Sequence, residues 1–87
     1  LHTHEADAIG LIVHGDEQTS QVIGRRLNHL SLPPRCFIAA IVRHNKVHIA
    51  QPDLLIETAD HIILLVLKKR YIRQVESLFQ VNLSFMS

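Results

Sequence analysis

Two runs of this sequence are apolar at nearly every position, and they constrain the fold more than any other feature. The first run is CFIAAIVR at 36–43, and the second is HIILLVL at 61–67. A strand that is covered on both faces of a sheet has this pattern, whereas a half-exposed strand alternates polar with apolar residues. We therefore expect both runs to be central strands. In the first run, strict alternation places Phe37, Ala39 and Ile41 on one face, and Cys36, Ile38, Ala40 and Val42 on the other.

The residues between these runs predict a hairpin and a short additional strand. His44-Asn45-Lys46 is a plausible tight turn, because asparagine tolerates a left-handed backbone. Residues 47–50 then return as the partner strand, and Pro52-Asp53 ends it. Residues 54–57 are expected to form a short edge strand before a turn at 58–60.

The flanking segments predict one more strand and two helices. Residues 9–14 alternate as a strand does. A hydroxyl at Thr19 or Ser20 is expected to cap a short helix that ends before Pro33-Pro34. The apolar stripe of that helix consists of Ile23, Leu27 and Leu30, and that of the last helix consists of Tyr71, Ile72, Val75, Leu78 and Phe79.

The expected fold class is α+β, with the order β-α-β-β-(β)-β-α and a mostly antiparallel sheet on which the helices pack. Residues 1–8 are interpreted as the end of a linker, residues 9–80 as one domain, and residues 81–87 as an apolar tail. Hydrophobic residues make up 47% of only 87 residues. So small a domain buries a modest fraction of its surface, which favours an apolar face covered by a second subunit or a neighbouring domain.

Charge and cysteine content exclude several classes of function. The formal net charge is +1, so no broad positive field attracts nucleic acid. Protonation of all seven histidines would raise it to +8, since 1 + 7 = 8. The single Cys36 is expected to be a buried, unreactive thiol in a reducing compartment. We expect a soluble chain without a signal peptide, because the longest apolar run is far shorter than a membrane span.

No pattern in the sequence indicates an enzyme. A nucleophile elbow, a phosphate-binding loop and a paired-carboxylate pocket are all missing from the sequence. Candidate metal ligands occur at His2, His4 and Glu5, at His44 and His48, and at Asp16 and Glu17. Their spacing and their lack of further donors favour scattered surface residues, so no metal is expected.

The basic residues offer two candidates for an anion site. Lys68, Lys69 and Arg70 come just before the last helix, where cations oppose the helix dipole. They form either an anion-binding surface, with helix amides contributing, or an ordinary solvated face. Arg43 ends a buried strand, and its guanidinium either reaches over a groove between subunits or faces water.

Several motifs in one order resemble the TrkA-C (RCK C-terminal) domain family, the C-terminal regulatory domain of TrkA-type proteins in bacterial Trk potassium uptake. The similarity extends from about residue 5 to residue 85. The motifs are HGDEQTSQVIGRRL at 14–27, LPP at 32–34, AIVR at 40–43, AD-H-II at 59–63 and VESLFQ at 75–80. The chain departs from the family pattern at four places. Arg35 and Ala59 stand where the family often has glycine, the turn at His44-Asn45 contains no glycine, and His2-Thr3-His4 replaces an arginine-rich stretch before the first strand.

The resemblance implies particular partners. Full-length subunits of the family carry Rossmann domains and assemble under a membrane potassium-translocating subunit. NAD(H) or ATP is expected only in those Rossmann domains, and no cofactor is expected in this domain, which has no Gly-x-Gly-x-x-Gly motif. The resemblance also implies a homodimer or tandem pair of C-domains. In some relatives the groove of that pair binds a regulatory ligand such as cyclic di-AMP, close to positions matching Ile41, Arg43 and Pro52.

The sequence and the resemblance together lead to one main hypothesis and one alternative. The main hypothesis is a non-enzymatic regulatory domain, cytoplasmic and peripheral to the inner membrane, that dimerises and couples ligand state to a potassium transporter. The alternative is a ferredoxin-like sensor of a small molecule or nucleotide, in which Arg43 and the Lys68–Arg70 cluster bind an anionic ligand. Nucleic acid is not expected as a partner, because the charge is near neutral.

Overall fold

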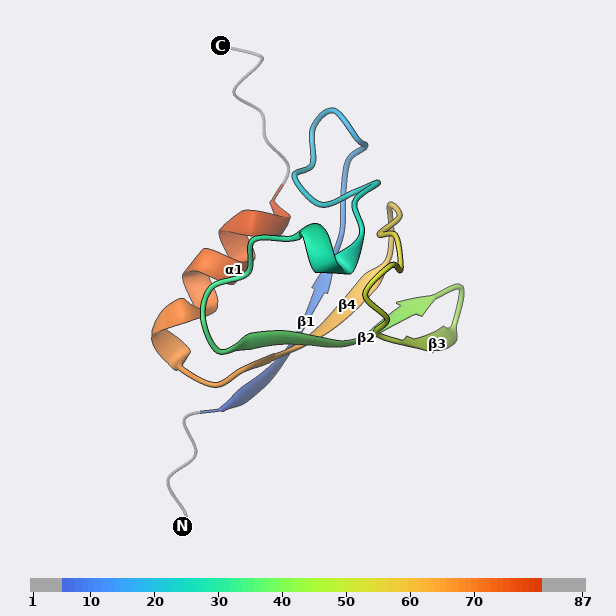
Figure 1. Ribbon diagram of the computed structural model, residues 1–87. Helices are drawn as coiled ribbons and strands as arrows, with labels where there is room; N and C mark the ends of the chain where they lie inside the picture. The colour runs from blue at the N-terminus through green and yellow to red at the C-terminus, as the bar shows by residue number, and fades with distance from the viewer. Residues whose placement is uncertain (1–5, 81–87) are drawn as a thin grey trace.

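A computed structural model describes residues 6–80, and its centre is one four-stranded antiparallel sheet (Figure 1). The strand order is β1-β4-β2-β3, so β4 and β2 are the central strands, as their apolar sequences predict. The strands are β1 Asp7–Ile12, β2 Cys36–Arg43, β3 Lys46–Ile49 and β4 His61–Val66. The α+β class and the antiparallel sheet are confirmed.

The hairpin between β2 and β3 is confirmed. Its turn residues His44 and Asn45 both have positive φ angles, of 51° and 63°. Two consecutive left-handed residues make a turn whose twist matches that of the flanking strands. The pairing that follows is regular, with Arg43 opposite Lys46 and Ala40 opposite Ile49.

The last helix is also confirmed. A 3-10 turn at Lys69–Tyr71 leads into α1, which spans Ile72–Phe79 and buries Val75 and Phe79 against the sheet. No helix within residues 6–80 is long and apolar enough to cross a membrane.

A single hydrophobic core lies on one face of the sheet, called here the covered face. The sheet contributes side chains from both central strands, and α1 and the two long connections pack onto them. The buried members are Val13, Val22, Ile23, Cys36, Ile41, Ile56, Ile62, Leu64, Val66, Val75 and Phe79. Every covering element therefore lies on the same side of the sheet.

The predicted first α-helix is wrong. Residues 20–30 form turns and one short 3-10 helix, at Leu27–His29. The backbone pairs across to residues 54–56 rather than within itself. Gly24 donates its N–H to the carbonyl oxygen of Ile56 at 2.8 Å, and Ile56 donates back to Arg25 at 3.1 Å.

Local residue chemistry explains this outcome. Gly24 has a φ of +80°, which no α-helix accommodates. The hydroxyl of Ser20 accepts hydrogen bonds from the N–H groups of Val22 and Ile23 at 3.1 and 3.2 Å, so it caps one turn only. The expected edge strand at 54–57 is likewise reduced to a single bridge between Arg26 and Leu55.

The predicted face assignment along β2 is also wrong, because of a β-bulge. The register with β4 shifts between Ile38 and Ala40, which leaves Ala39 as an extra residue. A bulge reverses the alternation beyond it. Phe37 consequently points away from the core and is 53% exposed, whereas Ile41 is fully buried on the covered face. The second face of the central strands is therefore open in the single chain.

Candidate functional site

Arg43 forms the densest polar network of the domain. Its Nε and Nη2 donate to the two carboxylate oxygens of Asp60, both at 2.8 Å. Nη2 also donates to the carbonyl oxygen of Leu55 at 2.8 Å, and Nη1 lies 3.0 Å from Oε2 of Glu57. The side chain of Asp60 is completely buried, and that of Arg43 is only 18% exposed. This paired geometry satisfies the planar guanidinium almost completely.

The network fixes the loop that leads into β4. Besides binding Arg43, Asp60 accepts a hydrogen bond from the N–H of Glu57 at 2.9 Å. The hydrogen bond from Arg43 to Asp60 raises the pKa of the guanidinium, which outweighs the opposing effect of burial. The donors of Arg43 are therefore already engaged by residues of the same chain.

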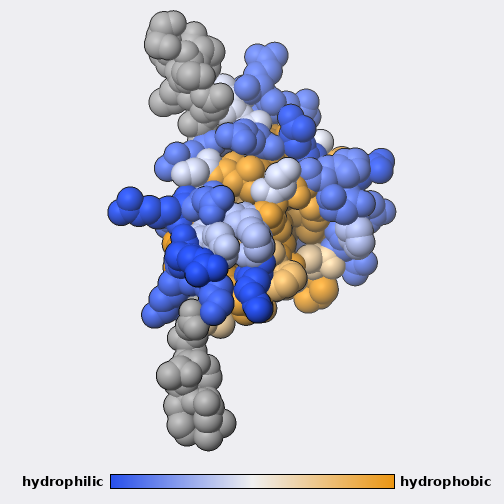
Figure 2. Space-filling model, turned by 60° about the vertical axis from the view of Figure 1, so that its left-hand side comes forward, coloured by the Kyte–Doolittle hydropathy of each residue, from blue (hydrophilic) through white to orange (hydrophobic). Residues whose placement is uncertain are grey.

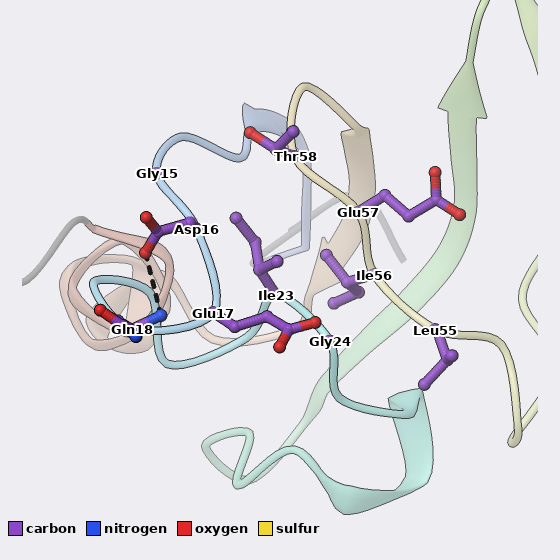
Figure 3. A pocket seen from close by; sticks show the side chains of 10 residues that line it. All are labelled: Gly15, Asp16, Glu17, Gln18, Ile23, Gly24, Leu55, Ile56, Glu57 and Thr58. Atoms are coloured by element: carbon purple, nitrogen blue, oxygen red, sulfur yellow. Dashed lines mark hydrogen bonds between the residues drawn. The ribbon is translucent and has the colours of Figure 1, made fainter.

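A groove of about 600 Å³ lies beside this loop (Figure 3). Its floor is apolar and its rim carries three carboxylates. The lining residues are Gly15, Asp16, Glu17, Gln18, Ile23, Gly24, Leu55, Ile56, Glu57 and Thr58.

Two of the three rim carboxylates already have partners in the chain. Oδ1 of Asp16 accepts hydrogen bonds from the N–H groups of Gln18 and Thr19, at 2.9 and 3.0 Å. These bonds lower the pKa of Asp16. Glu57 pairs with Arg43. Within residues 6–80, no three side chains of His, Cys, Asp or Glu come together as a metal site. The groove lies between loops, and no other feature of the described residues indicates that a ligand binds there.

The candidate anion-binding residues do not converge. Lys68, Lys69 and Arg70 follow β4, whose Val66 pairs with Cys36 at the start of β2. Arg43 is at the other end of the same eight-residue strand, roughly 23 Å away at the usual rise per residue. The guanidinium of Arg70 stacks on the neighbouring Tyr71 ring, 5.1 Å from its centroid.

The remaining candidates also lie apart. Ile41 is fully buried on the covered face. Pro52 is exposed in the loop after β3, and its carbonyl oxygen accepts the N–H of Asn28 at 2.9 Å. Cys36 is buried, its thiol donates to the carbonyl oxygen of Pro34 at 3.5 Å, and burial raises its pKa. A ligand that touched all these residues would have to enter the core.

The most extensive unusual surface is the second face of the sheet, called here the open face. Cross-strand pairs define it, because residues that face each other in a ladder point to the same side. From β1 to β3 it consists of Ala8, Gly10, Ile12, His61, Ile63, Leu65, Phe37, Ala40, Val42, Val47 and Ile49. His61 is the one titratable member among these residues.

Large side chains on the open face are strongly exposed. Ile12 and Phe37 are each 53% exposed, Val47 is 65% and Ile49 is 66%. Four strands of about five residues cover roughly 300 Å² in projection, which is the size of the largest apolar patch on a typical monomer, and such patches are often functional. Figure 2, turned so that the side of α1 in Figure 1 comes forward, shows apolar surface bordered by hydrophilic residues on the side that it draws.

Sequence reasoning missed the ion-pair partner of Arg43, although a signal was present. Antiparallel pairing of the two apolar runs brings Val42 opposite His61. The residue after Val42 is then a neighbour of the residue before His61, which is Asp60. The open face was missed for a different reason. The alternation of residues along the strand does not indicate the bulge at Ala39, and the bulge determines which side chains face outward.

Comparison with protein families places most of the chain in one group. Residues 17–80 match the model of the TrkA-C domain. The chain is 50% identical over 85 residues to the Trk system potassium uptake protein TrkA of Halomonas elongata, and 43% identical over 86 residues to that of Vibrio alginolyticus. These alignments cover 98% and 99% of the chain and 19% of each relative.

The fold has a counterpart among solved structures. An RCK domain whose structure was solved with cda superposes with a TM-score of 0.65 at 14% identity. The match covers 84% of the present chain and 97% of the other. At this identity the similarity concerns the fold alone.

Proposed function

The chain belongs to the TrkA-C domain family, and from that premise we propose that it is a regulatory domain of a Trk-type potassium uptake protein. Its relatives bear that name, and the chain spans about a fifth of their length. In this role the domain catalyses no reaction and lies in the cytoplasm at the membrane surface. It passes the state of the rest of the subunit to a potassium-translocating partner. NAD(H) or ATP would bind Rossmann domains elsewhere in such a subunit.

The observation that carries the proposal is the open face of the sheet. An apolar surface that runs across four strands is unfavourable in water, and the central strands have the composition of strands covered on both sides. We propose that a second copy of this domain covers it. A ligand or a neighbouring domain can then regulate transport by favouring one arrangement of the pair over another.

A second copy fits this face better than a charged partner does. The open face carries no carboxylate, lysine or arginine among its described members, so a charged partner would lose hydration without gaining an ion pair. A two-fold interface brings the same patch together from both subunits. For an uncharged patch, this arrangement creates no like-charge repulsion.

The alternative of an anion sensor receives less support from the geometry. Arg43 is occupied by Asp60, and the Lys68–Arg70 cluster lies at the opposite end of β2. A single phosphate cannot contact both. An anion could still bind the basic cluster alone, and thermal melting with nucleotides would detect this as a saturable rise in melting temperature.

The regulatory proposal is tested by grafting. The chain replaces the matching segment of the Halomonas elongata relative, and potassium uptake is measured in cells that lack their own copy of that protein. The wild-type graft should support uptake. Phe37→Lys, which places a charge on the open face, should abolish it, whereas Gln74→Lys on the exposed side of α1 should not. Normal uptake by the Phe37→Lys graft would contradict the proposal.

A further inference from the structure

His61 occupies a distinctive position on the open face. It begins β4, one of the two central strands, and lies between Ile12 of β1 and Val42 of β2. Its ring covers the backbone of Gly10, since a Cβ added there would collide with Nε2 of His61. A larger residue at position 10 would displace the imidazole from its present place over the sheet.

The ring has no charged neighbour to compensate a proton. Within residues 6–80, the imidazole of His61 makes no hydrogen bond or ion pair, although its backbone belongs to the ladder between β1 and β2. Asp60 precedes it, but its carboxylate points to the covered face and is bound to Arg43. β1 contributes Gly10 and Ile12, and β2 contributes Val42, none of which is titratable.

The charged groups nearest these strands lie on the covered side of the sheet, and one further histidine lies on the side of the open face. On β3, Lys46 and His48 pair with Arg43 and Ile41, which places them on the covered side of the ladder. His14 lies two residues beyond the end of β1 and on the same side as Ile12, because Val13 still bonds to the backbone of Asp60 and Ala59. It is exposed, and as a basic group it supplies no negative charge to His61. A protonated His61 would therefore enter an interface made of aliphatic and aromatic carbon.

We infer that His61 makes the pairing of the open faces sensitive to pH, so that mild acid separates the two copies. This inference rests on the proposed pairing. An imidazole in water takes up a proton near pH 6.5, and burial in an apolar environment opposes the charged form. Each subunit must release one proton before its face is covered. The dimer accordingly forms readily above neutral pH and dissociates below pH 6.

The size of the effect follows from two protons per dimer. If the covered ring stays neutral, the dissociation constant rises roughly 100-fold between pH 7.5 and pH 5.5. Electrostatic repulsion between two copies of the chain also grows in acid, because each copy has seven histidines. The specific contribution of His61 must therefore be separated from that of the others.

Sedimentation equilibrium of the 87-residue chain between pH 5.5 and 7.5 tests the inference, with circular dichroism recorded in parallel to confirm that the fold persists. His61→Leu and His61→Gln remove the titration, and we expect their dissociation constants to change less than about 10-fold over this range. The matched control His44→Gln, in the exposed hairpin turn, should keep the full dependence.

The outcomes separate the inference from the proposed function. A dimer whose affinity is the same at both pH values overturns the role of His61 and leaves the pairing intact. Full pH dependence in both His61 variants also overturns that role. A chain that is monomeric at pH 7.5 overturns the pairing and the inference together.

Discussion

At the scale of single residues, the Arg43–Asp60 pair decides how the domain is held together. Asp60 has no access to water, and its carboxylate is compensated by the guanidinium and by the N–H of Glu57. Arg43 in turn joins the end of β2 to the carbonyl of Leu55. Removal of either partner leaves the other buried and unpaired, which costs more than the pair itself contributes.

We predict that Arg43→Met lowers the free energy of unfolding by about 3 kcal/mol, because the charge of Asp60 is then uncompensated. The double variant Arg43→Met/Asp60→Leu should lose clearly less than the sum of the two single variants. Urea unfolding at one fixed protein concentration measures all three. Arg73→Met, at an exposed position of α1, is the matched control and should change stability by less than about 0.5 kcal/mol. Additive losses would show that the pair is not a coupled unit.

Cys36 gives a second test at this scale. Burial raises the pKa of its thiol and limits reagent access, so little reactive thiolate is available in the folded state. We predict slow labelling by a thiol-specific disulfide reagent in buffer and fast labelling in concentrated urea. Equal rates in the two conditions would mean that the start of β2 is open to solvent.

At the scale of elements, the sequence predicted the strands well and the first helix badly. The hydrophobic runs at 36–43 and 61–67 predicted central strands correctly, because a strand in the middle of a sheet is recognised from its apolar side chains alone. The segment at 20–30 has a helical stripe, yet Gly24 and the competing carbonyls of residues 54–56 draw its backbone elsewhere. Hydrogen bonding to a distant segment overrides the helical preference of only three apolar residues. The local sequence does not indicate that such bonds form.

Two departures from the family pattern gain a physical meaning at this scale. Arg35 and Ala59 stand where glycine is frequent, and both have positive φ angles, of 62° and 69°. A residue with a Cβ is strained by about 1–2 kcal/mol in this conformation. Both residues belong to connections that lead into central strands.

We predict that Ala59→Gly raises the free energy of unfolding by about 0.5–1 kcal/mol, because relief of strain exceeds the added flexibility of the unfolded chain. Arg35→Gly should act in the same direction. Ala50→Gly is the control, since φ is not positive there, and it should lose stability. Thermal unfolding compares the three. A loss in both Ala59→Gly and Arg35→Gly would contradict the strain argument.

At the scale of the whole molecule, one sheet face is packed and the other is open. The expectation that both faces of the central strands are covered fails for the single chain, yet the same composition is what a paired domain requires. The sequence indicated an apolar surface through its 47% hydrophobic content, but it could not locate that surface. The location depends on the bulge at Ala39, which turns Phe37 outward. The tail at 81–87 lies outside the described residues, as do residues 1–5.

The proposed pairing of the open faces is tested by the oligomeric state of the chain at pH 7.5, measured by sedimentation equilibrium for the wild type and two variants. Leu65 lies on central strand β4 within the open face and is 42% exposed, so Leu65→Lys should leave the fold unchanged while it prevents pairing. We expect a dimer for the wild type and for Gln74→Lys, and a folded monomer for Leu65→Lys. A monomeric wild type, or a Leu65→Lys variant that dimerises as the wild type does, would contradict the proposed pairing.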